Sequence, residues 1–468
     1  MSNEAVEKEN SLKPFSTIQL LNFCLGFFGL QFAWQMRIIL SGPVTEGLGA
    51  SPLLFGLIWL AGPVTGMVVQ PIIGELSDKT NTIFGKRRPY LFAGALFASL
   101  ALWAFPNSAA IAENTANILH KQLPVYGGLI IAAIMIWIID ACVNAAQGPY
   151  RALVPDLVPP EQHSLANSYL SFAIGLGSVV AAGTAPFLKY VCNYQMSINA
   201  QFIMAALAFS LAMLWTCITI KEHNSKKIDI VPAADNVNQE TEKISFLQKI
   251  TDFFKSSPEV GKICTLQFFT WIGIMSLNIF FTQYAIHTVY GIPDLTTASE
   301  EMKASYLPLM NKATNFSSIC FAIQNLICFL VSIPIGILST KFGNKKIHFA
   351  ALLTLALTFI GMGIYKEPKF VLICMAIAGI GWASILALPF AMLSEFIKKG
   401  SEGSVMGIFN IFIAGPQVLV CTVLAWIVSK CSYNVQQGIN YHWEYAFYIG
   451  AATLAAAAVI TNLIKEKQ

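Results

Sequence analysis

Four polar residues are regularly spaced within one apolar segment of the chain. Asp140, Asn144, Gln147 and Arg151 follow the run Ile-Met-Ile-Trp-Ile-Ile at positions i, i+4, i+7 and i+11. On an α-helix this spacing places the four side chains on one face, with the acid and the base about 16 Å apart along the axis. Such a stripe in an otherwise apolar helix must face a partner helix or a water-filled path.

Asp140 is the acidic residue that lies deepest within an apolar run of membrane length, and Arg37 lies within the first such run. Charged groups inside a bilayer are costly and usually functional. One interpretation is a static buried ion pair between Asp140 and Arg37. The other, which we favour, is that Asp140 takes up and releases a proton and so couples proton movement to transport. Glu46 and His287 are the next candidates, although a lone histidine near a helix end is more often an interfacial residue.

Further polar and aromatic residues in the apolar runs could contact a substrate. Arg151 cannot release a proton, so it would balance charge or bind a substrate, unless its side chain reaches the membrane interface. Aromatic and amide groups suit sugars, whose ring faces stack on tryptophan while their hydroxyls bond to amides. Residues of this kind are Trp271, Asn278, Trp382 and Asn410. Core packing accounts equally well for any single tryptophan.

The composition indicates a membrane protein. The chain has 468 residues, of which 55% are hydrophobic and 12% are charged, and its mean hydropathy is +0.61. A soluble domain usually carries about 25% charged residues, so water cannot be the solvent for most of the surface. The net charge of +4 does not indicate nucleic-acid binding, because the basic residues lie in short loops between apolar runs. We expect no nucleic-acid partner, no cofactor and no metal.

Apolar runs long enough to cross a bilayer, roughly 20 residues, recur along the chain. They predict an all-α polytopic membrane protein with twelve transmembrane helices over residues 16–41, 52–75, 89–106, 124–150, 164–188, 198–220, 261–290, 314–338, 347–364, 369–396, 404–430 and 443–464. The polar segment 221–258 reads as a cytoplasmic linker. Apolar residues at helical spacing over 246–254 fit either a helix on the membrane surface or a solvated linker. We therefore expect an N-terminal six-helix bundle (1–220) and a C-terminal one (259–468).

A short polar loop, residues 74–89, lies between two of these runs. Its charged residues include Asp78, Lys79, Lys86, Arg87 and Arg88. A weaker echo at 336–346 suggests a duplicated membrane unit. Lysine and arginine resist translocation, so both loops and both termini should face the cytoplasm. We expect a monomeric multi-pass protein of the cell membrane, in contact with lipids.

The loop charges should act on conformational balance rather than on the substrate. Asp78 can meet the N-terminus of a neighbouring helix or a basic residue such as Arg88, and so latch the cytoplasmic gate. Lys86, Arg87 and Glu395 complete the predicted gating set. Glu395 should belong to a charge cluster with the nearby lysines 398 and 399. A solvated surface loop is the alternative.

Several motifs together resemble a known family. The Gly-x-x-x-Asp…Gly-Lys-Arg-Arg-Pro loop and its echo are similar to the signature of the major facilitator superfamily. More specific are the blocks Leu-Gln-Phe-Ala-Trp (30–34), Ile-Trp-Leu-Ala-Gly-Pro-Val-Thr-Gly-Met-Val-Val-Gln-Pro (58–71), and Asp140 followed by Gln-Gly-Pro-Tyr-Arg-Ala-Leu (147–153). With Pro-Phe-Ala (389–391) and Pro-Gln (416–417), they resemble the sucrose–proton symporters and their relatives among the glycoside:cation symporters.

The resemblance implies a fold and a mechanism. The fold would be two pseudo-symmetric six-helix bundles around a cavity lined by the first, fourth, seventh and tenth helices. The function would be proton-coupled symport of a sugar or glycoside by alternating access. Asp140 would be the proton-coupling acid, and Arg151 a substrate or charge-pair residue. We expect the same site to include Gln31, Trp34, Arg37, Asn144 and Gln147.

The chain also departs from the plant sucrose carriers. They have a histidine where this chain has Leu-Gly-Ala-Ser-Pro (48–52), an aspartate and an arginine where it has Gln283 and His287, and an uncharged residue at Arg37. The identity of the sugar is therefore open. A uniporter, a Na⁺-coupled carrier and a transport-inactive nutrient sensor remain alternatives. The motifs His-Glu-x-x-His and Gly-x-Ser-x-Gly, a phosphate loop and a filter-like repeat are missing, so we expect neither an enzyme nor a channel.

Overall fold

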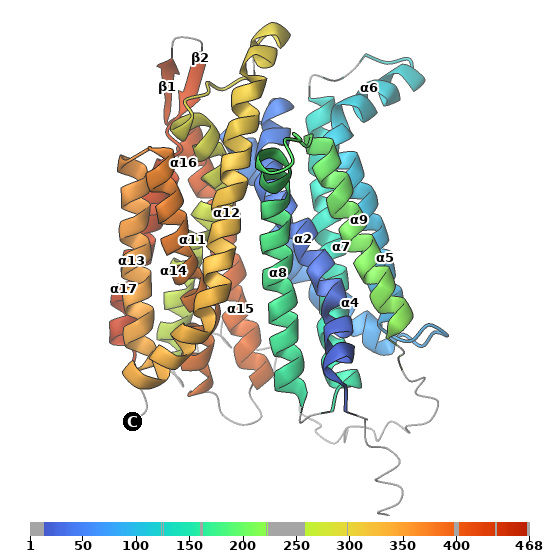
Figure 1. The fold of residues 1–468 in the computed structure, drawn as a ribbon, viewed down its shortest axis with the longest axis vertical. Helices are drawn as coiled ribbons and strands as arrows, with labels where there is room; N and C mark the ends of the chain where they lie inside the picture. Colours follow the sequence, from blue (N-terminus) through green and yellow to red (C-terminus); the bar gives the residue numbers. More distant parts are fainter. Residues whose placement is uncertain are drawn as a thin grey trace, which may run out of the picture.

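The structure, a computed structural model, describes residues 14–122, 124, 126–159, 162–220, 222, 258–296, 298–396, 402–435 and 438–465. Within these residues, twelve helices are long and apolar enough to cross a membrane (Figure 1). The twelve spans expected from hydropathy are therefore confirmed. The possible surface helix at 246–254 lies outside the described residues.

The first six spans form what we call the N-terminal group. They are α2 (Thr17–Gly47), α3 (Pro52–Trp59) with α4 (Ala61–Lys79), α5 (Arg88–Ala104) with the 3₁₀ turn η1 (Phe105–Asn107) and α6 (Ser108–Ile118), α7 (Gly127–Leu157), α8 (His163–Tyr190) and α9 (Ile198–Thr219). Helix α2 packs against α8 and α9, and α7 packs against α4 and α5. The polar face of α7 therefore meets side chains from other spans of this group.

The last six spans form the C-terminal group. They are α11 (Pro258–Gln283) with the π-helical turn η3 (Tyr284–Val289), α12 (Glu300–Phe342), α13 (Asn344–Ile364), α14 (Pro368–Ser394), α15 (Glu402–Leu419) with the π-helical turn η4 (Val420–Leu424) and α16 (Ala425–Lys430), and α17 (Tyr445–Leu463). Helix α11 packs against α17 and α15, and α14 packs against α12 and α13. An antiparallel hairpin of β1 (Ser432–Val435) and β2 (Gly438–Tyr441) joins α16 to α17.

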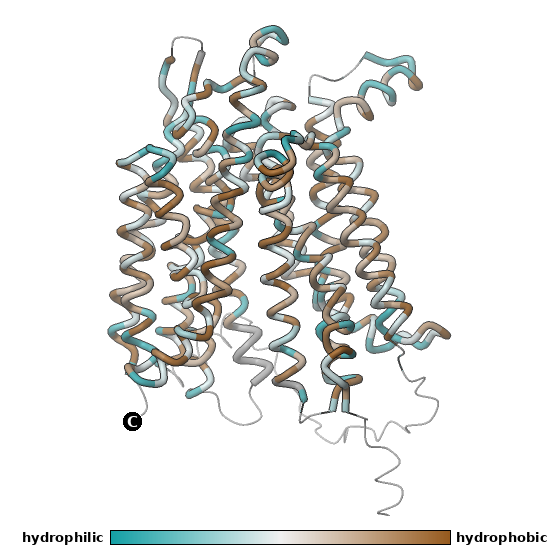
Figure 2. Tube along the Cα trace, viewed as in Figure 1, coloured by the Kyte–Doolittle hydropathy of each residue, from teal (hydrophilic) through white to brown (hydrophobic). Residues whose placement is uncertain are grey.

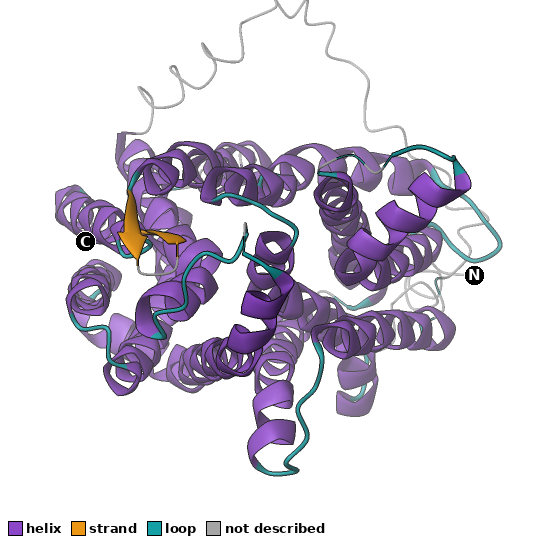
Figure 3. Ribbon diagram, turned by 90° about the horizontal axis from the view of Figure 1, so that it is seen from above, coloured by secondary structure: helices purple, strands orange, loops and turns teal. Residues whose placement is uncertain are grey.

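The two groups lie side by side when the molecule is seen from above (Figure 3). They meet where α8 packs against α12, where α2 packs against α11 and α12, where α3 packs against η4 and α16, and where α4 packs against α15. We call the end with α6 and the hairpin the upper end, and the end with the loop between α4 and α5 the lower end, as drawn in Figure 1. These terms carry no assignment to a side of the membrane.

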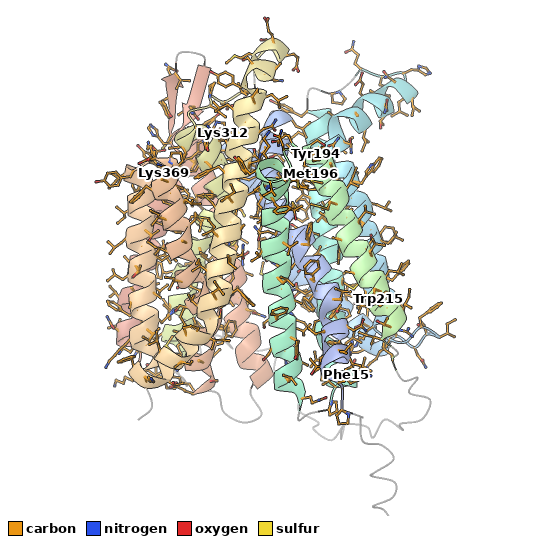
Figure 4. All side chains as sticks on the ribbon, viewed as in Figure 1. Phe15, Tyr194, Met196, Trp215, Lys312 and Lys369 are labelled. Carbon is orange, nitrogen blue, oxygen red and sulfur yellow. The ribbon has the colours of Figure 1, made fainter. Side chains whose placement is uncertain are left out.

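The outer surface of the helices is apolar along its middle. Hydrophobic residues run along the central part of the helices, and hydrophilic residues gather at the two ends (Figure 2). Large side chains such as Trp103, Phe187, Leu211 and Trp215 are more than half exposed, and Trp215 points outward from α9 (Figure 4). Exposed apolar area of this extent is what a lipid-facing surface requires.

The third span continues through η1 and α6 to Ile118, beyond its expected end at residue 106, and two further elements differ from the expected pattern. Helix α12 begins at Glu300 rather than near residue 314, because Ser299 caps it by accepting a hydrogen bond from the Met302 amide, and Glu300 and Glu301 lie in its first turn. Serine caps and acidic first turns stabilise helix N-termini independently of hydropathy. The hairpin was not predicted, since its strands are only four residues long.

Candidate functional site

A buried ion pair lies at the centre of the N-terminal group. Nη2 of Arg37 on α2 lies 2.6 Å from Oδ2 of Asp140 on α7, and the two side chains are 1% and 0% exposed. The guanidinium carbon lies 4.4 Å from the ring centroid of Trp59 and 5.2 Å from that of Trp34. Contact with two aromatic faces stabilises a desolvated cation. The pairing of Arg37 with Asp140 thus exists in this conformation.

The pair is incompletely satisfied. Oδ1 of Asp140 and both Nε and Nη1 of Arg37 are buried without a hydrogen-bond partner among the described residues. Buried polar atoms without partners are costly and rare, so these three call for a functional explanation. These three atoms are one acceptor and two donors, which is the complement that a hydroxyl group can satisfy.

The polar stripe of α7 continues from Asp140 toward the lower end. Nδ2 of Asn144 donates to Oγ1 of Thr65, 2.9 Å away. Nε2 of Gln70 donates to Oδ1 of Asn144 at 2.8 Å and to Oε1 of Gln147 at 3.0 Å. The amides of α7 therefore face α4. Thr65 and Gln70 of α4 are functional candidates that the sequence analysis did not name as site residues. Gln70 lies in a block that the family resemblance had already singled out, which was the available signal.

Arg151 ends the stripe in a different environment. The residue as a whole is exposed, and its guanidinium carbon lies 5.6 Å from the ring centroid of Phe27 on α2. Gln31 is half-buried and packs against Gly177 of α8. The structure therefore brings Arg37, Trp34, Asp140, Asn144 and Gln147 into one connected cluster, with Arg151 farther along α7 and Gln31 at the α2–α8 contact.

The expected residues of the C-terminal group form a separate set. Trp271 on α11 and Trp382 on α14 pack edge to face with their ring centroids 5.9 Å apart. Nε1 of Trp271 is buried without a hydrogen-bond partner in the described part of the chain. Asn278 is half-buried and contacts Met275, whereas Asn410 on α15 is exposed. The tryptophan pair supplies an aromatic surface with one free donor.

The charged loop at the lower end is tied together within the N-terminal group. The guanidinium of Arg87 bonds to Asp78, to Ser77 and, through Nε at 2.9 Å, to Oδ2 of Asp156 at the end of α7. Lys86 joins them, with Nζ 3.0 Å from Oδ1 of Asp156. Burial lowers the pKa of Arg87, but the carboxylates of Asp156 and Asp78 outweigh burial and raise it. Asp78 therefore meets a basic residue, as expected, but that residue is Arg87 and not the example Arg88, which is turned toward α9.

Glu222, which sequence reasoning missed, anchors the start of α5. Its carboxylate accepts hydrogen bonds from the backbone amides of Lys86, Arg87 and Arg88 at 2.8–3.1 Å. Arg88 also donates to the carbonyl of Cys217, near the end of α9. Gly85 adopts a φ of +101°, and a Cβ there would lie 2.6 Å from the Glu222 carboxyl carbon. A carboxylate at a helix N-terminus is favourable, but no local pattern announces one that arrives from 134 residues away.

The second half holds a related arrangement at its own lower end. Asn344, at the start of α13, donates to Oε1 of Glu395, just after α14, at 3.3 Å. Glu395 thus contacts the loop that echoes the charged loop of the N-terminal group. Lysines 398 and 399, its expected partners, lie outside the described residues.

Comparisons with known proteins agree with this fold. The family model described as MFS/sugar transport protein matches residues 29–299, and that of the Major Facilitator Superfamily matches residues 299–467. The sucrose transport protein SUT2 of Oryza sativa subsp. japonica is 26% identical over 426 residues, covering 84% of this chain and 83% of that protein. The sucrose transport protein SUC4 of Arabidopsis thaliana is 24% identical over 422 residues, covering 84% and 80%.

Solved transporter structures share the architecture. The nucleoside transporter NupG superposes with a TM-score of 0.61 at 13% identity, over 97% of this chain and 100% of its own. The inward-open xylose transporter XylE from E. coli gives 0.59 at 14% identity, over 96% of each chain. At these identities the likeness concerns the fold.

The matching family models and the relatives of similar length are those of membrane transport proteins, and the described part of this chain has the twelve membrane-length helices of such a transporter. The chain belongs to the major facilitator superfamily, in the family of MFS/sugar transport proteins. The resemblance inferred from the sequence motifs is thereby confirmed.

Proposed function

We propose that this protein is a secondary active transporter that carries a sugar or glycoside together with a proton. The observation that carries the proposal is the Arg37–Asp140 pair, buried against two tryptophan rings with unpartnered atoms on both members. Relatives that match most of the chain are sucrose transport proteins. The relatives support a sugar as the substrate, and the buried carboxylate of the pair supports a proton as the coupling ion.

The chemistry of the cluster suits a polyol. A sugar hydroxyl could donate to Oδ1 of Asp140 and accept from Nη1 of Arg37 at the same time. Trp34 and Trp59 offer ring faces, and Asn144 and Gln147 offer further amides toward the lower end. Trp271 and Trp382 would form the facing aromatic surface of a cavity between the two groups, near the membrane midplane. We place the substrate there.

Proton coupling would act through the charge of Asp140. With a negative charge, Asp140 holds Arg37 in the ion pair. Protonation removes the attraction and frees the guanidinium to bind the sugar, so that the loaded site can reorient. We propose that the N-terminal six-helix bundle (1–220) and the C-terminal one (259–468) rock against each other in this step, while the charged loop of the lower end sets the balance between conformations.

Uptake into proteoliposomes tests the proposal. Purified protein should exchange labelled sucrose or a related glycoside in counterflow. It should also accumulate that sugar when the outside is made acidic in Na⁺-free buffer. If the sugar accumulates only when a Na⁺ gradient is imposed, the coupling ion is Na⁺ and not the proton. Counterflow without accumulation under either gradient would define a uniporter. Absence of counterflow across a panel of disaccharides and glycosides would overturn sugar transport.

We further propose that the lower end and both termini face the cytoplasm, in the cell membrane. Cysteines introduced at the exposed lower-end residues Lys79 and Lys346 should react with an impermeant maleimide only after cells are permeabilised. Cysteines at Lys312 and Lys369, near the upper end (Figure 4), should react in intact cells. A Cys192→Ser background removes the exposed native thiol. Reaction of positions 79 and 346 from opposite sides would contradict both the orientation and the two-bundle arrangement.

A further inference from the structure

A small polar cavity lies at the upper end where the two groups of helices meet. Its walls include Glu46 from the end of α2, His287 from η3, Asp294 from the loop before α12, and Tyr441 and Trp443 from the hairpin region. It encloses about 10 Å³, which is room for at most one water molecule. Oε2 of Glu46 bonds to His287 and Gln283, whereas Oε1 of Glu46 is buried without a hydrogen-bond partner among the described residues.

His287 is bonded at both ring nitrogens. Nδ1 lies 2.9 Å from the carbonyl oxygen of Ile292, and Nε2 lies 2.9 Å from Oε2 of Glu46. A carbonyl oxygen can only accept, so Nδ1 carries a hydrogen. The Nε2–Glu46 contact then needs a proton of its own, either on an imidazolium that donates to a carboxylate or on a carboxylic acid that donates to the imidazole. In either form, the pair holds one proton more than a neutral histidine beside an ionised glutamate.

The surroundings of the pair are buried and aromatic. His287 is 2% exposed and stacks on Trp443 with ring centroids 5.7 Å apart, a geometry that tolerates a cation. Gln283 donates a second hydrogen bond to Glu46. The other titratable groups facing the pair are Asp294 and the Tyr441 hydroxyl. Burial raises the pKa of Asp294, a shift that its hydrogen bond from the Thr296 amide opposes. The sequence suggested that His287 is an interfacial residue, but the structure shows that it is buried.

The pair joins the two groups of helices. Glu46 belongs to the N-terminal group, and His287 and Gln283 belong to the C-terminal group. Contact here is close, since a Cβ on Gly42 would lie 2.5 Å from Oε1 of Gln283. Separation of the groups at the upper end would break the pair and expose both residues to water. A solvated glutamate is ionised and a solvated histidine is mostly neutral above about pH 6.5.

We propose that Glu46 and His287 form a second proton-binding site, distinct from Asp140, that is complete only when the upper end is closed. Closure brings together a carboxylate and a neutral imidazole and takes up one proton, and opening releases it. Because the closed state binds more protons, rising pH favours the open state. The inference rests on the proposed alternating access, but its readout needs neither substrate nor transport.

Spin labels across the upper end test this site. Cysteines at the exposed residues Leu119 and Lys369, in the Cys192→Ser background, report the separation of the two groups by pulsed electron resonance. The Cys192→Ser protein without the two added cysteines, treated with the same spin label, is the negative control. The ratio of open to closed molecules should rise by up to about tenfold per pH unit above about pH 6.5, as one linked proton requires.

Variants separate a proton site from a structural contact. The amide of Glu46→Gln can donate to a neutral His287, so closure should persist while its pH dependence disappears. His287→Gln should also lose the pH dependence. Asp294→Asn, which alters the neighbouring acid of the same cavity, should keep it. A wild-type distribution unaffected between pH 6 and 8, or an unchanged pH response in Glu46→Gln, would overturn the site. If the label distance still shifts when sugar is added, alternating access is supported even though the second proton site has failed. The failure of the proton site can therefore be distinguished from the failure of the proposed transport mechanism.

Discussion

Asp140→Asn should abolish uphill sugar accumulation while leaving sugar exchange across the membrane. Asparagine keeps the shape of the side chain and can still accept a hydrogen bond from Arg37, but it carries no charge in any state. With one proton per sugar, each pH unit of gradient supports about tenfold accumulation in the wild type. For the Asp140→Asn variant, the ratio of the sugar concentration inside to that outside should fall to about one. Accumulation under an imposed pH gradient, and counterflow at equal pH, measure the two properties separately.

Two comparisons make this result specific. Glu113→Gln removes an exposed acid on α6 and should accumulate sugar like the wild type. Asp140→Asn that still accumulates sugar in proportion to the imposed pH difference would move the coupling site away from Asp140. The Glu46–His287 pair would then be the next candidate for that role.

Arg37→Gln should be among the most destabilising single substitutions in the N-terminal group. It leaves Asp140 buried at 0% exposure without the one ionic partner that it has among the described residues, and removing one member of a buried pair typically costs about 3–5 kcal/mol. Accumulation should be lost as well, because Asp140 must then stay protonated to remain buried. Thermal unfolding of purified protein in detergent, together with proton-driven uptake, measures both effects.

A double variant and a conservative one identify the cause. Arg37→Gln/Asp140→Asn removes both charges, so it should recover much of the lost thermal stability but none of the accumulation. Arg37→Lys keeps the charge but loses the planar guanidinium over Trp34 and Trp59, and its loss of stability should be smaller than that of Arg37→Gln. A double variant less stable than Arg37→Gln would show that the buried charge of Asp140 is not the source of the loss.

The membrane architecture and part of the site follow from the sequence. A bilayer requires spans of about 20 apolar residues, so hydropathy alone predicts the number of helices. Helical periodicity places Asp140, Asn144 and Gln147 on one face, and the structure shows that face bonded to α2 and α4. The cost of charge in lipid singles out Arg37 and Asp140 as candidates. These features depend on the transfer of each side chain into lipid and on the geometry of a single helix, and both can be evaluated from one segment of the sequence.

Partner choice, by contrast, depended on packing. Asp78 pairs with Arg87 rather than with its neighbour Arg88, because the turn before α5 directs one guanidinium toward α7 and the other toward α9. Contacts with other helices or loops, not with sequence neighbours, define the roles of Trp59, Gln70 and Glu222. His287 became a buried half of a pair because the close packing of Gly42 against Gln283 brings Glu46 to it. The sequence by itself determined which side chains must avoid lipid, because that cost is local; the tertiary structure decided which of them meet, because distance between helices is not encoded in any one of them.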